Sequence, residues 1–156
     1  MKIKSFFGNS LVFICLISTQ ALSNNTADNG IIKIKSNYSV SETLNRLENV
    51  LSKKGMTIFK RVNHTAGAEK ADLQLRPTEL LIFGNPKVGT PLMLCSQTAA
   101  LDLPQKALAY KDENNQVWLA YNDPVFIAKR HQTKDCEQAI MKVSKALEKF
   151  SKAATE

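Results

Sequence analysis

The sequence predicts a single α+β domain in which an antiparallel sheet of four to five strands carries helices on one face. Two observations predict this fold class. Short apolar or alternating segments follow one another through polar turns, as strands joined by hairpins do. Amphipathic segments with helical spacing lie near both ends of the same region, with no internal repeat or second domain between them. Consecutive strands joined by hairpins favour an antiparallel sheet over a doubly wound parallel one.

The first 23 residues have the pattern of a secretory signal peptide. Lys2 and Lys4 precede an apolar run from Leu11 to Ile17, and small residues follow at Ala21 and Ser23. We expect cleavage near Ser23 and export to the periplasm or the cell exterior. The apolar run is shorter than the roughly 20 residues that a membrane span needs, so no stable span is expected in the mature chain. Residues 24–30 are expected to be a flexible mature N-terminus, and residues 31–152 the folded domain.

The first half of the domain is predicted as strand, helix and strand. Residues 31–35 alternate between apolar and lysine side chains, which is typical of a strand with one solvated face. Ser39 precedes Glu42 by three positions, a capping-box spacing, and apolar residues then recur at helical intervals, which predicts a helix over residues 40–54. Residues 56–63 alternate again and predict a second strand, which the segment after it interrupts.

The segment from Thr78 to Met93 organises the rest of the chain: it predicts a buried strand, a turn and a helix start. A four-residue apolar run ends at a glycine, and Thr90 with Pro91 has the pattern of an N-cap followed by proline at the first helical position. Backbone N–H groups of such a turn can point into one concavity, with Lys87 nearby, and this geometry suits an anion. The alternative is that Gly84, Asn85 and their neighbours only shape a tight turn and cap a helix.

The second half is predicted as a hairpin followed by two helices. Residues 106–110 and 116–121 flank a polar turn whose asparagines can take positive φ. Asp123 with the proline after it repeats the cap pattern and begins a short helix. A final amphipathic helix is predicted over residues 136–152, with Asp135 as its N-cap.

Net charge and cysteine count narrow the functional classes. Removing Lys2 and Lys4 with the leader lowers the formal charge from +7 to +5, and the basic residues are too dispersed to predict nucleic-acid binding. Cys95 and Cys136 remain in the mature chain; they either form one disulfide, as an oxidising compartment permits, or stay as two buried thiols. Their spacing matches no zinc pattern, so no metal or cofactor is expected.

Four stretches of the chain resemble the domain of unknown function 302 family: NHTAGA from Asn63, LRPTELLIFGNPKVGTPLM from Leu75, LDLPQKALAY from Leu101 and VWLAYNDPVFIAKRH from Val117. The resemblance covers about residues 31–150. It implies a compact α+β domain similar to the TATA-binding-protein-like fold, and a dimer as one form, but no reaction. Gln105 departs from the family pattern, in which an apolar residue is commoner, and so does the Asn114–Asn115 turn; both are expected to lie outside the candidate site.

The candidate ligand-binding residues lie at the ends of predicted strands and helices: His64, Arg76, Gly84, Asn85, Lys87, Gly89, Thr90, Tyr121, Asn122, Asp123 and His131. Each has a plain structural alternative, since turn formers shape turns, Asp123 caps a helix and an arginine at a strand start is commonly exposed. Two histidines without a third ligand do not define a zinc site.

Three functions compete on these residues. The leading hypothesis is a non-catalytic periplasmic binding or accessory protein that holds a small polar or anionic ligand between the Gly84–Thr90 loop and the Tyr121–Asp123 turn. The second is an enzyme that uses His64 or His131 as general acid or base beside Tyr121 and Asn85, which requires these side chains to meet in one pocket. The third is a homodimeric interaction module that uses an exposed sheet face or the final helix.

Overall fold

The computed structural model describes residues 29–156 and contains one five-stranded antiparallel sheet. The expected signal peptide and most of the expected flexible N-terminus lie outside these residues. The strands are β1 (Ile31–Ser36), β2 (Thr57–Asn63), β3 (Thr78–Gly84), β4 (Gln105–Lys111) and β5 (Val117–Asn122). Their order across the sheet is β1-β5-β4-β3-β2, so the predicted hairpin of β4 and β5 lies at its centre. The α+β class and the antiparallel sheet are as predicted.

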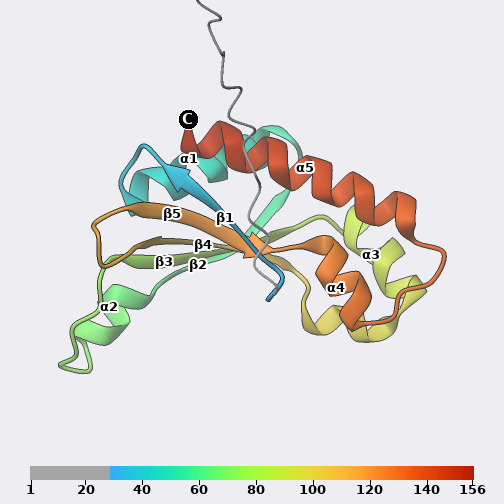
Figure 1. Cartoon of the computed structure of the whole chain (residues 1–156), viewed down its shortest axis with the longest axis horizontal. Helices are drawn as coiled ribbons and strands as arrows, with labels where there is room; N and C mark the ends of the chain where they lie inside the picture. Colours follow the sequence, from blue (N-terminus) through green and yellow to red (C-terminus); the bar gives the residue numbers. More distant parts are fainter. Residues whose placement is uncertain (1–28) are drawn as a thin grey trace, which may run out of the picture.

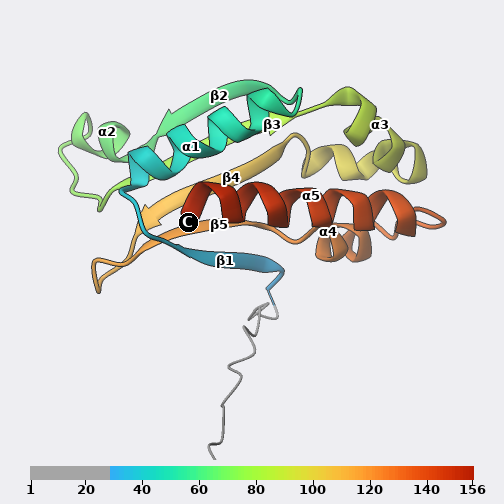
Figure 2. The ribbon, with the colours of Figure 1, turned by 90° about the horizontal axis from the view of Figure 1, so that it is seen from above.

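Two long helices lie side by side across one face of the sheet (Figures 1 and 2). These are α1 (Val40–Lys53) and α5 (Glu137–Thr155). Apolar residues at helical spacing in both helices meet the alternating apolar residues of β3, β4 and β5, and together they form the core. Leu44, Leu81 and Leu119 have no exposed surface, which places the centre of the core between α1 and the middle of the sheet.

The shorter helices lie at the two ends of the sheet (Figure 1). β3 and β5 both run antiparallel to β4, so their C-terminal ends lie at the same end of the sheet. α3 (Pro86–Cys95) and α4 (Pro124–Arg130) begin there, and a 3-10 helix, η1 (Gln97–Leu101), follows α3. β2 ends at the opposite end of the sheet and leads into α2 (His64–Glu69). The topology therefore gathers α3, η1 and α4 at one end of the molecule and leaves α2 alone at the other.

The segment expected to interrupt the second strand does so as a helix: Asn63 Oδ1 accepts a hydrogen bond from Ala66 N and caps α2. Two local predictions were wrong. Helix α3 begins at Pro86 with Asn85 as its N-cap, so Thr90 and Pro91 lie inside the helix instead of starting it. The final helix begins after Cys136, and Asp135 does not cap it but takes a positive φ of 57°. At the start of α3, Asn85–Pro86 and Thr90–Pro91 offer the same capping pattern, and the folded chain uses the first of them.

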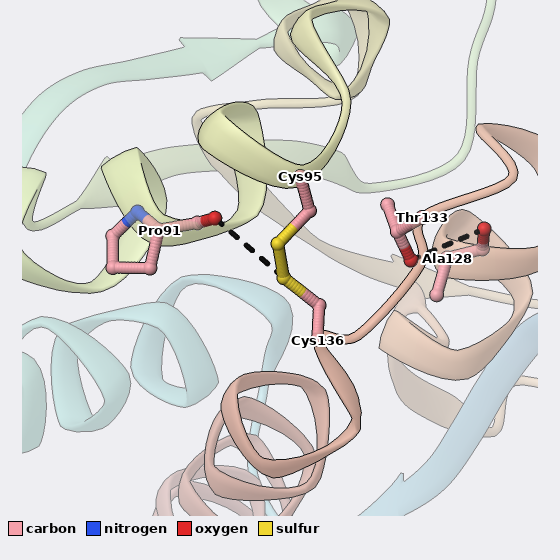
Figure 3. The surroundings of a disulfide bond; sticks show 5 residues. All are labelled: Pro91, Cys95, Ala128, Thr133 and Cys136. Carbon is pink, nitrogen blue, oxygen red and sulfur yellow. Dashed lines mark hydrogen bonds between the residues drawn. A yellow bond between two sulfur atoms is a disulfide. The ribbon is translucent and has the colours of Figure 1, made fainter.

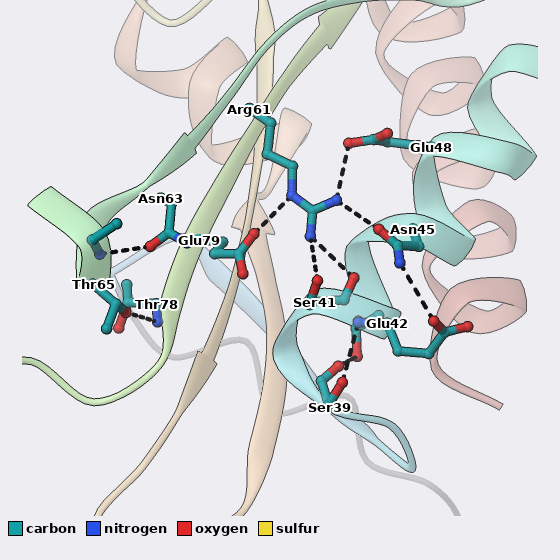
Figure 4. A network of polar contacts seen from close by, with 12 residues as sticks. Ser39, Ser41, Glu42, Asn45, Glu48, Arg61, Asn63, Thr65, Thr78 and Glu79 are labelled. Atoms are coloured by element: carbon teal, nitrogen blue, oxygen red, sulfur yellow. Dashed lines mark hydrogen bonds and ion pairs between the residues drawn. The ribbon is translucent and has the colours of Figure 1, made fainter.

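Arg61 joins α1 to the far edge of the sheet (Figure 4). Its Nε donates to Glu79 Oε2 at 2.7 Å, and its two terminal nitrogens donate to Asn45, Glu48 and Ser41 of α1. Glu79 is nearly buried, so the guanidinium supplies the charge that its carboxylate needs. This cluster is fully occupied by protein partners, and we assign it a structural role.

Candidate binding pocket

The turn between β3 and α3 is closed by its own hydrogen bonds. Asn85 Oδ1 accepts from Lys87 N, and Asn85 O accepts from both Val88 N and Gly89 N. Asn85 Nδ2 donates to Gly55 O at 2.9 Å, which fastens the turn to the end of α1. This corrects the expected anion cradle, because the amides of Lys87, Val88 and Gly89 are already bonded within the turn. Asn85 is the N-cap of α3, which agrees with the alternative that this segment shapes a turn and caps a helix.

A pocket of about 240 Å³ nevertheless opens beside this turn. Gly84, Asn85, Gly89 and Thr90 form one side of it, as the sequence predicted for the location of a site. The other walls are apolar and come from β2, α3, η1 and the start of β4: Phe59, Val88, Met93, Ala100, Leu103 and Pro104. Lys87 is exposed and does not line it. The pocket is therefore shaped for an apolar group, and none of the described residues that line it is charged.

Gln105 is the one buried polar side chain in the pocket wall. It begins β4 and is 8% exposed. Its amide makes no hydrogen bond to another described residue, and no fully covered side-chain nitrogen or oxygen atom among the described residues lacks a partner, so the amide is not fully covered. Gln105 lines this pocket and also a smaller cavity beneath α4. The expectation that Gln105 lies outside the site was wrong. Its departure from an apolar family pattern was the signal that could have found it.

The Tyr121–Asp123 turn does not join this pocket. Tyr121 is buried beneath α5, where desolvation by burial, opposed by a hydrogen bond with Ser151, raises the pKa of its phenol to about 12. Asp123 Oδ1 accepts from Val125 N and its carbonyl accepts from Ile127 N, so Asp123 is a helix cap. Neither residue lines the pocket, and nor does Asn122. The predicted site between the two turns is thus reduced to the β3–α3 side.

The two histidines lie at opposite ends of the molecule. His64 is exposed and starts α2, whereas His131 is buried at the end of α4. His131 Nε2 lies 2.6 Å from Asp102 Oδ2, and its Nδ1 lies 3.0 Å from Thr98 Oγ1. Sequence reasoning missed both partners, because nothing local links η1 to α4. The convergence that the enzyme hypothesis requires does not occur.

His131 and Asp102 fasten η1 to α4. Arg130 adds a contact of 3.3 Å to the other Asp102 oxygen, and Thr98 Oγ1 lies 3.1 Å from Ser96 Oγ. Neither His131 nor Thr98 lines the pocket, although η1 supplies Ala100 to its wall. The cluster therefore does not line the pocket. It holds η1, which supplies part of the pocket wall, against α4.

Arg76 lies far from the pocket, at the start of β3. Its Nε donates to Lys111 O at 3.2 Å, and a terminal nitrogen lies 3.9 Å from Glu113. Its side chain is mostly exposed, which agrees with the structural alternative for this residue.

Cys95 and Cys136 are joined as a disulfide in the structure (Figure 3). Their Cα atoms lie 6.4 Å apart and 41 positions apart in the chain. The bond links the last residue of α3 to the residue that caps α5, and Pro91 O lies 3.7 Å from Cys136 Sγ. It holds the helix that walls the pocket against the body of the domain.

Metal binding and membrane spanning find no support in the part of the chain that the structure describes. Between residues 29 and 156, no three His, Cys, Asp or Glu side chains are grouped closely enough to hold a metal ion. Over the same residues, none of the helices combines the length and apolar character that crossing a membrane requires.

Sheet order and helix placement define the class of protein, an α+β domain with two helices across one face of a five-stranded antiparallel sheet. The same fold is found in the crystal structure of an uncharacterized conserved protein DUF302 from Bacillus stearothermophilus, with a TM-score of 0.73 over 80% of this chain and 98% of that one, at 17% identity. The family model described as "Domain of unknown function DUF302" matches residues 32–150. The chain belongs to this family.

Curated relatives match part of the chain more closely. Fluoride-specific ion channel FluC 1 of Brucella suis biovar 1 (strain 1330) is 49% identical over 104 residues, which are 67% of this chain and 41% of that protein. FluC 1 of Brucella abortus biovar 1 (strain 9-941) shows the same identity over 38% of its length. The chain thus spans about two-fifths of the length of these relatives.

Proposed function

We propose that this chain is an exported, non-catalytic binding or accessory protein that holds a small ligand in the pocket beside α3. The observation that supports it is the pocket of about 240 Å³, which lies where the strand–turn–helix segment predicted a site. Ligand pockets are typically concave, mostly apolar and furnished with a few polar groups. This one has that character, and its volume lies below the roughly 300–1,000 Å³ of drug-sized pockets, which favours a small ligand.

The walls favour a ligand with a short apolar body and one hydrogen-bonding group. The apolar walls gain from displacing water, and Gln105 offers an amide that can both donate and accept. A bare anion is less well served, because the amides from Lys87 to Gly89 are bonded within the turn and Lys87 lies outside the pocket.

Export and the disulfide belong to the same proposal. A leader ending near Ser23 would deliver the chain to an oxidising compartment, where a Cys95–Cys136 bond forms and persists. Mass spectrometry of protein purified from the periplasm without reductant tests both points. We expect a mass that begins after residue 23 and lacks two hydrogens. A full-length mass, or two free thiols, would contradict this part.

The Brucella relatives favour a second candidate, an accessory role beside fluoride transport. Their name describes a fluoride channel, and 49% identity over 104 residues relates the matched region closely to this chain. Since that region is only 41% of the relative, the channel activity itself is not carried over. On this candidate the pocket, or a surface near it, responds to fluoride.

Calorimetric titration with hexanol and with sodium fluoride separates the two candidates. We expect hexanol to bind and fluoride to give no heat above dilution. Ala100→Trp, which fills the pocket from an exposed position, should abolish hexanol binding, whereas Ala71→Trp at an exposed alanine outside the pocket should not. Gln105→Leu should weaken hexanol binding about fivefold by removing one hydrogen bond. Fluoride binding without hexanol binding would favour the accessory role, and binding of neither would contradict both.

A further inference from the structure

Within residues 29–156, one face of the sheet has no helix over it. α1 and α5 lie on the opposite face, as Figures 1 and 2 show. Residues directly opposite one another in an antiparallel sheet share a face. The pairing therefore places one continuous row on the uncovered face, across all five strands: Lys33, Ala120, Leu108, Leu80 and Val62. This uncovered face has an apolar centre.

Every charged side chain that the strands place on the uncovered face is a lysine. Lys35 lies beside Trp118 and Tyr110 in a second row, and Lys60 and Lys106 flank Ile82 in a third. Lys35 Nζ sits 5.7 Å from the centre of the Trp118 ring. Glu79, the only acidic residue in the five strands, points to the other face, toward Arg61. Beyond the strands, the Asp112 carboxylate in the β4–β5 turn accepts a hydrogen bond from Trp118 Nε1 at 2.7 Å. The strand residues thus make the uncovered face cationic and apolar, with the Asp112 carboxylate at the β4–β5 turn.

Exposed apolar side chains gather at both ends of this face. The loop after α2 carries Leu73, which is 64% exposed, and Leu75. At the other end η1 carries Leu101, which is 75% exposed, and α4 carries Val125 and Phe126. Both ends lie on the side of the sheet away from α1 and α5 (Figure 1). A flat surface approaching the uncovered face meets these two ends first and the lysines between them next.

We propose that the uncovered face docks onto an anionic phospholipid surface. Lysines interspersed with tryptophan, tyrosine and leucine suit the headgroup region, which is negatively charged outside and apolar within. A second copy of the chain fits less well. A two-fold contact through this face sets the same patch on both sides, so the lysines of one copy would face those of the other, and the carboxylate at the β4–β5 turn, Asp112, is already bonded to Trp118.

Co-sedimentation of the mature protein with vesicles tests the proposal. With vesicles of phosphatidylglycerol and phosphatidylcholine in equal parts we expect binding that weakens as salt is raised, and with phosphatidylcholine alone we expect none. Reversing Lys33, Lys35 and Lys60 to glutamate should lower the affinity by at least about tenfold, since each lysine near an anionic surface contributes to binding. Leu73→Ser combined with Leu101→Ser should also weaken binding, at unchanged net charge.

A matched control separates this face from net charge. Lys142, Lys145 and Lys149 are exposed on α5, on the other side of the sheet. Their reversal to glutamate changes the net charge by the same amount and should leave binding within about twofold, because they face away from the surface. An equal loss in both triple variants, or no binding to anionic vesicles, overturns the proposal. So does a dimer in light scattering that the Lys33, Lys35 and Lys60 reversal dissociates.

Discussion

The β3–α3 and β5–α4 turns share the same capping pattern, but the cavities beside them differ greatly in volume. Each follows a strand that ends at the same sheet edge, and each has an Asx cap followed by proline at the first helical position. In both, the cap side chain accepts a backbone N–H of the first helical turn. Yet a pocket of about 240 Å³ opens beside α3, and only about 10 Å³ remains beneath α4.

Packing makes the difference between the two turns. α4 buries Pro124 and Ile127, and Phe126 lies against Gly30. α3 is three residues longer but buries only Leu92, and its glycine offers no side chain to fill the space beside it. A cap and a proline thus fix where a helix begins, whereas the volume of the neighbouring side chains decides whether a ligand has room.

Loss of the disulfide should sharpen this difference most. In Cys95→Ser combined with Cys136→Ser we expect the free energy of unfolding to fall by roughly 4 kcal/mol, from the chain entropy of a loop of this length. Since the bond is at the C-terminal end of α3, and α3 buries only Leu92, the amides of α3 should lose hydrogen-exchange protection more than those of α4. Urea unfolding and hydrogen exchange measure the two effects. Equal loss of protection in both helices would show that the bond stabilises α3 no more than α4.

Adding a side-chain atom beside the well-packed helix α4 should destabilise the protein. Gly30 has a φ of 70°, and a Cβ there would overlap the Phe126 ring. Gly30→Ala should therefore lower the free energy of unfolding by about 1–3 kcal/mol. Gly55→Ala is the matched control, because its φ is 71° but a Cβ would meet nothing within 4 Å. If the two variants lose the same stability in urea, backbone strain alone explains the loss and the Phe126 contact does not matter.

Burial at the end of β5 also predicts a pH dependence. The pKa of Tyr121 is raised from 10.0 to about 12, first by desolvation and further by the charges of Glu148 and Asp123. Its neutral form is favoured in the folded state, so this contribution is complete below pH 10 and is lost as the pH rises through about 12. Phenolate absorbance should show one late-ionising tyrosine that is missing in Tyr121→Phe. Its ionisation together with the other tyrosines would mean that this end of β5 is open to water.

Adding a side-chain atom to α3 beside the pocket should not lower the free energy of unfolding. A Cβ at Gly89 would lie 3.7 Å from Leu103 Cδ1, an ordinary contact, and the residue lies within a helix. Gly89→Ala should therefore raise the free energy of unfolding by about 0.5–1 kcal/mol and modestly weaken hexanol binding. A destabilised variant would mean that the pocket is tighter than its volume implies.

Local patterns predicted most of the fold but only part of the site. Alternation, short apolar runs and helical spacing located the five strands and the helices α1 and α5, and the cap pattern of Asp123 with proline located α4, because each pattern lies within one segment. The start of α3 was misplaced, since Asn85–Pro86 and Thr90–Pro91 carry the same local signal five residues apart. The partnership of His131 with Asp102 joins positions 29 apart, and only the folded chain brings them together.

The most direct test of the account is the change in backbone amide chemical shifts as hexanol is added to the mature protein. We predict saturable shifts at Gly84, Gly89 and Gln105, which line the pocket. We predict no shifts in the β5–α4 turn, at Asn122, Asp123 and Val125. Shifts confined to the β5–α4 turn, or spread evenly over the apolar surface without saturation, would contradict the claim that the pocket beside α3 is the binding site.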